Sequence, residues 1–188
     1  MKAVAIWLMH CLEWALLGVG IGALGVYGYE SVEARRFQAQ QTAAFESAAK
    51  SERAPSRVAA GGLVGMLDVP RLQLSTPVIE GDDDRTLKRA VGHLPDTPMP
   101  WESGNSAMAG HRDGLFRPLK DVKVGDEIRF RTTRDEFIYR VTKTSIVAPD
   151  DVSVLERQSE ATLTLITCYP FYYVGSAPQR FIVHATRQ

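Results

Sequence analysis

Two side chains near the C-terminal end of this 188-residue chain could together carry out nucleophilic chemistry. Cys168 closes the run TLITC, and Arg180 follows twelve residues later. A thiolate is a strong nucleophile when a nearby cation stabilises it, and acyl transfer also needs a donor for the developing oxyanion. The permanent charge of Arg180 would serve both needs if a hairpin-like turn returns it beside Cys168.

A purely structural role for Cys168 is the alternative, because unpaired cysteines are among the most frequently buried side chains. The other cysteine, Cys11, lies in an apolar N-terminal run as a packing residue, so a disulfide between the two is implausible. If the domain lies outside the cytoplasm, an unpaired thiol is an oxidation liability. Position alone therefore leaves the reactive and the packing role equally open.

Acyl transfer through a thiol also needs an acid–base partner, and the chain has four histidines. With ordinary pKa values of about 8.5 and 6.5, about 3% of a thiol is thiolate and about 24% of an imidazole is protonated at pH 7. A neighbouring charge must raise the ion-paired fraction, or the enzyme works slowly from a minor state. His10 belongs to the apolar run, and His184 follows Arg180 on the same predicted strand. Spacing alone does not show which of the other two, His93 or His111, is the acid–base partner.

The N-terminal segment, residues 1–29, is a predicted membrane anchor. It is mostly apolar, and no charged residue occurs from Trp14 to Tyr29. A bilayer-spanning helix needs about 20 mostly apolar residues, and this segment is long enough even with Glu13 inside it. A cleaved signal peptide is the competing interpretation, but the apolar stretch is longer than usual and no small-x-small site closes it. Basic residues lie on both flanks, so charge does not decide the orientation.

A polar tether, residues 30–62, is predicted to follow the anchor. Its first half is rich in Ala, Gln, Ser and Glu and could continue as a polar helix. The second half ends in SERAPSRVAAGG, where a proline and a glycine pair indicate a flexible spacer. The folded domain is therefore expected to stand off the membrane.

The remaining segment, residues 63–188, is predicted to be a mainly β domain. Short runs that are rich in branched residues, or that alternate polar and apolar residues, are separated by turn-forming residues. These runs occupy residues 63–69, 72–79, 106–111, 127–132, 136–147, 161–168 and 180–186. Seven or eight short strands with one or two short helices predict a closed or nearly closed β-barrel, since closure removes exposed strand edges.

An acidic triplet, Asp82–Asp84, is predicted to cap a short helix that places Leu87 and Val91 on one face. A calcium site is the alternative, but the spacing lacks the required loop and bidentate ligand. The sequence therefore predicts no metal ion and no cofactor. The 22 basic and 22 acidic residues give a net charge of zero, so no basic surface predicts nucleic-acid binding.

Two motifs resemble the sortase family of cysteine transpeptidases. GNSAMAGHRDGLFRPL, residues 104–119, is similar to the segment around the family's histidine, and TLITCYPFYYVGSAPQRFIV, residues 164–183, is similar to its TLxTC strand and downstream arginine. The similarity also includes VGMLDVPRLQLSTPVIEG and LKRAVGHLPDTPMPWESGN, so it covers most of Leu63 to Arg187. The long aromatic loop after the cysteine is most similar to the class D type.

The resemblance implies a sortase-like closed barrel in which Cys168 is the nucleophile and His111 the general acid/base. Arg180 would stabilise the oxyanion or the substrate, and Thr167 would shape the site. The implied reaction is attack on the Thr–Gly carbonyl of an LPxTG-like sorting signal, followed by transfer of the thioacyl intermediate to an amine or to water. The partners are then proteins with a C-terminal sorting signal and an amine acceptor in the cell envelope, with a single membrane span and the catalytic domain outside the cytoplasm.

Two departures from the family pattern bear on substrate preference. MPWES, residues 99–103, stands where a small glycine-containing turn is expected, and Gly114 follows HRD where a bulkier residue is common. Both are expected near the His111 loop, whereas His93 is expected to support the fold. The competing functions are a hydrolytic cysteine peptidase or another envelope acyltransferase, and a non-catalytic, membrane-tethered β domain in which Cys168 is merely buried.

Overall fold

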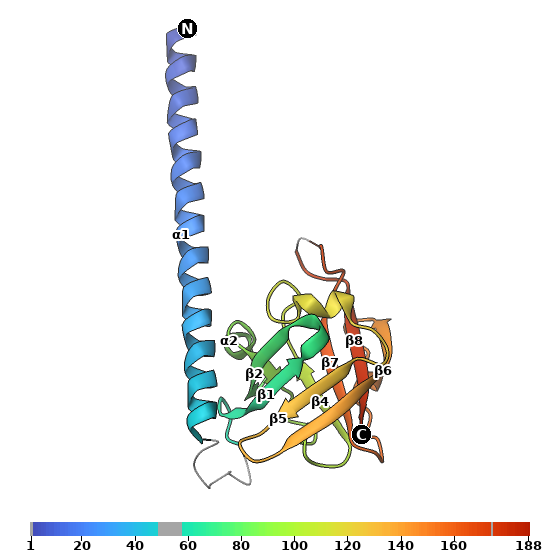
Figure 1. Ribbon diagram of the computed structural model, residues 1–188. Helices are drawn as coiled ribbons and strands as arrows, with labels where there is room; N and C mark the ends of the chain where they lie inside the picture. The colour runs from blue at the N-terminus through green and yellow to red at the C-terminus, as the bar shows by residue number, and fades with distance from the viewer. Residues whose placement is uncertain (1, 49–57, 174) are drawn as a thin grey trace. The chain divides into compact units, whose positions relative to one another are not determined.

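A computed structural model describes residues 2–48, 58–173 and 175–188 of the chain (Figure 1). The chain divides into two compact units, Met1–Phe37 and Gln38–Gln188. Most of the spacer expected at residues 51–62 lies outside the described residues, as does the side chain of Cys11. At the end of that spacer, Gly61 adopts a positive φ of 76° and Gly62 N–H donates to the carbonyl of Ala59, so the glycine pair forms the turn that leads into the barrel.

One long helix, α1 (Lys2–Ala48), contains the predicted anchor. Its large apolar side chains from Leu12 to Tyr29 are all more than half exposed. The region Leu12–Ser47 includes a stretch that is long and apolar enough to cross a membrane. A helix that is apolar on all sides and not covered by protein is typical of a membrane span. The helix continues without a break beyond residue 29, so the first part of the predicted tether is helical.

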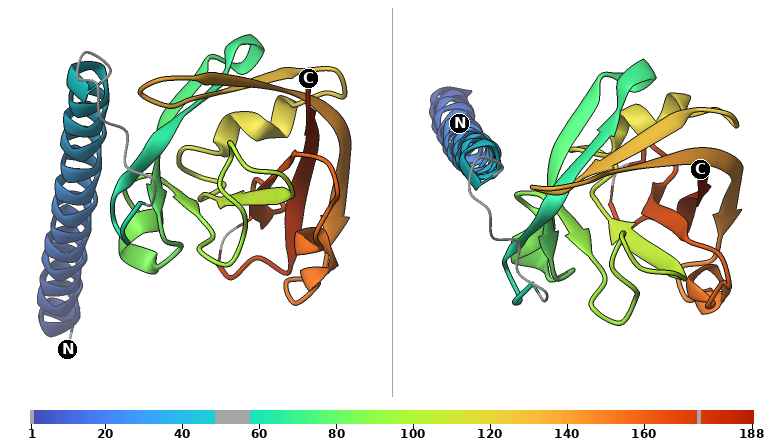
Figure 2. Two further views of the ribbon diagram at one scale, coloured as in Figure 1. Left: turned by 90° about the horizontal axis from the view of Figure 1, so that it is seen from below. Right: turned by 60° about the horizontal axis from the view of Figure 1, so that its bottom comes forward.

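The second unit contains a closed β-barrel, in which eight described strands surround the core (Figure 2). The strands are β1 (Leu63–Val69), β2 (Leu74–Glu80), β3 (Val91–His93), β4 (Asn105–Ala109), β5 (Glu127–Arg131), β6 (Glu136–Val147), β7 (Thr162–Tyr169) and β8 (Gln179–Arg187). Their order around the barrel is β1-β2-β3-β4-β7-β8-β6-β5, and β5 pairs with β1 to close it. The β2–β3 and β4–β7 pairs are parallel, and the other pairs are antiparallel. The predicted mainly β, closed-barrel fold is confirmed.

The barrel core follows from the alternation of side chains along each strand. In β5, Ile128 and Phe130 are fully buried while Arg129 between them is exposed. Successive side chains of a strand point to opposite faces, so this pattern places one apolar face inside the barrel. Leu67, Met108 and Tyr139 contribute the same inward face from β1, β4 and β6.

The short helices differ in part from the sequence prediction. Helix α2 (Asp84–Leu87) is capped by Asp83, whose carboxylate accepts the N–H groups of Arg85 and Thr86, so the capping role of the triplet is confirmed. These hydrogen bonds, with one from the Thr86 hydroxyl as the largest cause, lower the pKa of Asp83. The prediction that Val91 continues this helix is wrong, because the helix ends at Leu87 and Val91 begins β3. The described part of the domain also contains three 3-10 helices: η1 (Pro70–Leu72), η2 (Arg117–Asp121) and η3 (Val152–Leu155).

The two ends of the barrel carry different loops, as Figure 1 shows. The loop between β7 and β8 and the helix η2 lie at one end. The turn between β5 and β6 lies at the other end, where the side chain of Arg187 at the end of β8 donates to the carbonyl of Trp101. Residues 180 and 187 of β8 are separated by about 23 Å at the usual rise of a strand, so the two ends are distinct sites.

Candidate functional site

Three adjacent strands position the residues expected to do chemistry. β7 lies between β4 and β8 in the barrel wall. In the antiparallel β7–β8 pair, Cys168 is the direct partner of Arg180. The predicted hairpin-like return of Arg180 to Cys168 is therefore present in the backbone register.

His111 reaches the same place from the other side of β7. In the parallel β4–β7 pair Ala109 is opposite Ile166, and Gly110 N–H donates to the carbonyl of Ile166 at 3.1 Å. His111 lies two residues after Ala109, and Cys168 lies two residues after Ile166. The predicted strand ending at His111 is two residues too long, since β4 ends at Ala109. His111 therefore belongs to the turn that leaves the sheet, beside the end of β7.

Thr167 connects the two segments directly. Its side chain is buried, and its hydroxyl donates to the carbonyl of Gly110 at 2.7 Å. Since Gly110 precedes His111 and Thr167 precedes Cys168, this bond holds the histidine turn against the cysteine strand. Thr167 thus has a position from which it can shape the site.

Gly110 is required at this turn because a large side chain packs against it. A Cβ atom at Gly110 would lie 2.8 Å from the ring of Phe116, which is fully buried. The N–H groups of Gly114 and Phe116 both donate to the carbonyl of His111 at 3.2 Å. The aromatic ring and these bonds fix the course of the backbone on both sides of His111.

A cavity of about 360 Å³ brings the expected residues together. Its lining includes Cys168, His111 and Arg180, together with Arg112, Asp113 and residues 175–177 of the β7–β8 loop. His111 is exposed and Cys168 is a free thiol of intermediate exposure. A partly exposed cysteine that lines a cavity does not fit a residue whose only role is core packing.

The described side chains of Cys168, His111 and Arg180 line one cavity without direct hydrogen bonds between them. Arg180 donates through Nη1 to the carbonyls of Ala177 at 3.3 Å and Gln179 at 3.1 Å, which holds the guanidinium at the base of the loop. Within the described parts of the chain, no hydrogen bond or ion pair joins Cys168 to His111 or to Arg180. Such catalytic hydrogen bonds often tighten only when substrate is bound.

Arg112 is a residue of this cavity that the sequence reasoning did not select. Its side chain is buried, with 9% exposure, although it carries a permanent charge. Its position directly after His111, in HRD, could have indicated a place in the site. An arginine in a loop is ordinarily expected at the surface, so this position was not used.

Two other histidines lie in the barrel and outside the lining of this cavity. His93 is fully buried, with Nδ1 2.7 Å from a carboxylate oxygen of Glu80 and Nε2 3.0 Å from the carbonyl of Pro98. These contacts agree with the expected role in supporting the fold. His184 lies 3.2 Å from the hydroxyl of Thr164, and burial, followed by the positive charge of Lys143, lowers the pKa of its imidazole.

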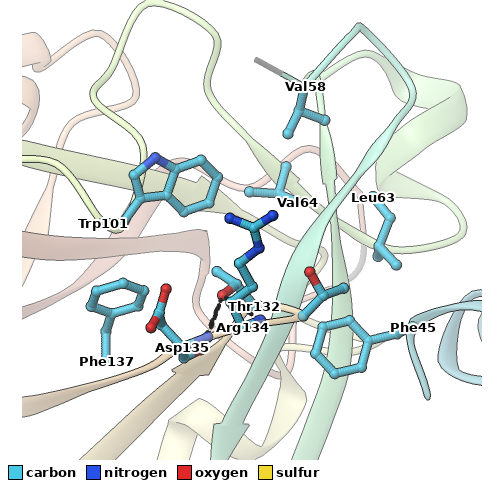
Figure 3. Close-up of a pocket in the computed structure, with 10 residues that line it drawn as sticks. Phe45, Val58, Leu63, Val64, Trp101, Thr132, Arg134, Asp135 and Phe137 are labelled. Atoms are coloured by element: carbon cyan, nitrogen blue, oxygen red, sulfur yellow. Dashed lines mark hydrogen bonds between the residues drawn. The ribbon is translucent and has the colours of Figure 1, made fainter. Parts of the chain in front are cut away.

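A second cavity, of about 330 Å³, lies at the β5–β6 end of the barrel (Figure 3). Apolar side chains that include Trp101, Phe137 and Val64 surround it, and Arg134 and Asp135 reach it from the turn. Its described lining contains no cysteine or histidine. MPWES was expected near the His111 loop, but Trp101 lies here, at the end opposite Cys168. Gly114 is where it was expected, with its ideal Cβ position 3.7 Å from the Cβ of His111.

Among the described residues, no three or more His, Cys, Asp or Glu side chains form a group that could hold a metal ion.

Comparison with known proteins relates the chain to one family. Residues 67–188 match the family model described as "Sortase domain". The chain is 41% identical to Sortase D of Bacillus subtilis (strain 168) over 128 residues, which are 68% of this chain and 65% of that protein. It is 30% identical to Sortase A of Bacillus anthracis over 110 residues, which are 56% of this chain and 52% of that protein. The chain thus spans about half to two thirds of the length of these relatives.

Solved structures give the same result. A Clostridium perfringens Sortase D5 transpeptidase is similar with a TM-score of 0.69 and 28% identity, covering 82% of this chain and 97% of that one. Sortase A from Corynebacterium diphtheriae is similar with a TM-score of 0.64 and 28% identity, covering 69% of this chain and 62% of that one. The expected family, with its class D-like character, is confirmed.

Proposed function

The chain belongs to the sortase family, and on that premise we propose that it is a cysteine transpeptidase that cleaves an LPxTG-like sorting signal between Thr and Gly. Cys168 is the nucleophile, His111 the general acid/base, and Arg180 the cation that stabilises the oxyanion. The substrates are proteins that carry such a signal near the C-terminus, and the acceptor is an amine of the cell envelope.

The observation that carries this proposal is the arrangement of three strand ends around one cavity. Cys168 and Arg180 are direct partners in the β7–β8 register, and His111 follows β4 on the opposite side of β7. All three line the cavity of about 360 Å³. A thiol nucleophile flanked by an imidazole and a fixed cation has a base and an oxyanion donor at hand, and acyl transfer needs both functions.

The reaction proceeds in two steps. The Cys168 thiolate attacks the carbonyl carbon of the Thr–Gly bond, and the guanidinium of Arg180 stabilises the negative oxygen of the tetrahedral intermediate. His111 gives a proton to the departing amine as the C–N bond breaks, which leaves the acyl group on sulfur. An acceptor amine, or water, then attacks the thioester while His111 takes its proton, and the thiolate departs.

The apolar helix α1 supports a membrane-anchored form of this enzyme. We place its apolar part across the bilayer as a single span, with the barrel outside the cytoplasm. A substrate that is itself held at the membrane would then meet the barrel near the bilayer face, because both partners are confined to the same surface.

Peptide cleavage tests the proposal. The full-length protein in detergent is incubated with a library of LPxTG-type peptides and an amine such as triglycine, and the products are separated by chromatography. We expect cleavage after Thr, with transfer to the amine, and no product from Cys168→Ala. Absence of any Cys168-dependent product from the library would overturn the proposed activity.

Thiol labelling separates the enzyme from a non-catalytic β binding domain. We expect the alkylation rate of Cys168 to depend on pH and to change in His111→Ala, because an acid–base partner affects the thiolate fraction. An inert Cys168 in the folded protein would favour the binding domain instead.

A further inference from the structure

Arg112 is a buried cation without an anionic partner. Its side chain is 9% exposed, and it makes no ion pair within residues 2–48, 58–173 and 175–188. Burying an unpaired charge is costly, so buried charges are ordinarily paired with an opposite charge or a ligand.

One half of the Arg112 guanidinium is used by the protein. Nη2 donates to the carbonyl of Tyr173 at 2.7 Å and to that of Gly175 at 3.0 Å. The guanidinium carbon also lies 5.8 Å from the centre of the Tyr173 ring. These contacts connect the His111 turn to the β7–β8 loop, so the guanidinium is held in place.

The other half of the guanidinium is unused. Nη1 is buried and has no hydrogen-bond partner in the part of the chain that the structure describes. Leaving such a donor unsatisfied costs about 1–3 kcal/mol, and more when the group is charged. The proposed mechanism does not use Arg112, because Arg180 already faces Cys168 across the β7–β8 pair.

The surrounding charges favour an anionic ligand. Arg112 and Arg180 both line the cavity, and the Asp113 carboxylate is the one acidic side chain in its described lining. A guanidinium pairs well with a carboxylate or a phosphate, because its parallel N–H groups match two anionic oxygens, and of these two groups a peptide or amino-acid ligand supplies the carboxylate.

We propose that Arg112 forms a carboxylate-binding subsite next to Cys168, in which Nη1 donates to a carboxylate oxygen of a ligand that enters the cavity. The carboxylate comes either from the sorting peptide or from the acceptor amine compound. Because Nη1 is buried and Nη2 is held by the loop carbonyls, ligand binding requires residues 175–177 to shift so that the carboxylate oxygen reaches Nη1. The inference rests on the proposed function for the identity of these two ligands, but the subsite itself requires only a carboxylate near the thiol.

Paired ligands test the subsite in the full-length protein. In the peptide series, Asp or Asn is placed at each position that flanks the Thr–Gly bond, and each Asp peptide is compared with its Asn counterpart by kcat/KM. In the acceptor series, glycine is compared with glycinamide. We expect the carboxylate form to be preferred by about tenfold in one of the two series. A preference in the peptide series assigns the carboxylate to the sorting peptide, and a preference in the acceptor series assigns it to the acceptor.

Arg112→Gln is expected to abolish that preference, whereas the control Arg117→Gln, at an exposed arginine of the same segment, is expected to keep it. A ratio of two ligands on one variant is not changed by a general loss of loop order, so it separates binding from a structural role. No carboxylate preference in the parent protein, or an equal preference in Arg112→Gln, would overturn the proposal.

A second measurement does not depend on sortase activity. The rate at which iodoacetate alkylates Cys168 is divided by the rate for neutral iodoacetamide, with the modified peptide quantified by mass spectrometry. The ratio is expected to fall several-fold in Arg112→Gln and to stay unchanged in Arg117→Gln. If peptide cleavage fails but this ratio falls, the proposed function is wrong and the subsite stands. An unchanged ratio contradicts the subsite.

Discussion

At the residue scale, the pairing of Cys168 with Arg180 could be predicted and the pairing with His111 could not. A twelve-residue step between two strands is compatible with an antiparallel hairpin, and the register places the two residues opposite each other. His111 reaches Cys168 through the parallel β4–β7 pair, which joins segments more than 50 residues apart. Spacing does not encode such a contact, so only the resemblance to the family selected His111. Arg112 was missed because sequence does not reveal the burial of a charged side chain.

Arg180→Lys tests whether the planar guanidinium is needed. An ammonium group keeps the charge but offers no fork of N–H groups, so kcat/KM for peptide cleavage is expected to fall about 10- to 100-fold. The unfolding temperature should not change, because among the described residues Arg180 donates only to carbonyls of its own loop. The control Arg117→Lys should retain full activity. Near-normal turnover of Arg180→Lys would remove Arg180 from the mechanism.

At the element scale, alternation predicts long strands and fails on short ones. Seven of the strands were expected, and β6 and β7 agree closely with their predicted ranges. β3 was missed because three residues, Val91–His93, are too few to show a period of two. The end of β4 was placed too late because Gly110 and His111 follow a strand-like run, although the close packing of Phe116 against Gly110 turns the chain there.

Gly110→Ala tests how that turn positions His111. The added methyl group would meet the Phe116 ring, so we expect a loss of about 1–3 kcal/mol in the free energy of unfolding and a marked fall in kcat. Gly114→Ala is the matched control, since its methyl group would have ordinary contact with the Cβ of His111. Denaturant unfolding and peptide cleavage measure the two effects. Equal behaviour of the two variants would show that the packing at Gly110 does not set the position of His111.

At the scale of the whole molecule, the order of the strands around the closed barrel sets where its cavities lie and which distant residues meet. The cavity lined by Cys168 and the cavity lined by Trp101 lie at opposite ends of the barrel. Composition and local sequence pattern do not reveal this arrangement. Three neighbouring strands of the wall also enclose His184 on β8, between Thr164 on β7 and Lys143 on β6. Contacts of this kind depend on the order of strands around the barrel, and the sequence does not state that order.

The half-buried position of His184 predicts an acid-sensitive fold. Burial and Lys143 lower the pKa of His184 from its ordinary value of 6.5, so the unfolded chain binds more protons than the folded chain as pH falls below that value. The stabilisation is therefore fully present above about pH 6.5 and is lost as pH falls toward the lowered pKa. His184→Gln should lose less unfolding free energy between pH 7 and pH 5 than the parent protein, as measured by urea denaturation. Equal losses would contradict a depressed pKa for His184.

The most direct test of the account as a whole is the mass of Cys168 after incubation with an LPxTG-type peptide and no acceptor. Intact-protein mass spectrometry of the full-length chain should detect an added acyl fragment that ends at Thr, and peptide mapping should locate it on Cys168. Triglycine should remove the adduct, and Cys168→Ala should never form it. A peptide library that gives no adduct on Cys168, or an equal adduct in Cys168→Ala, would contradict a thioacyl mechanism at this site.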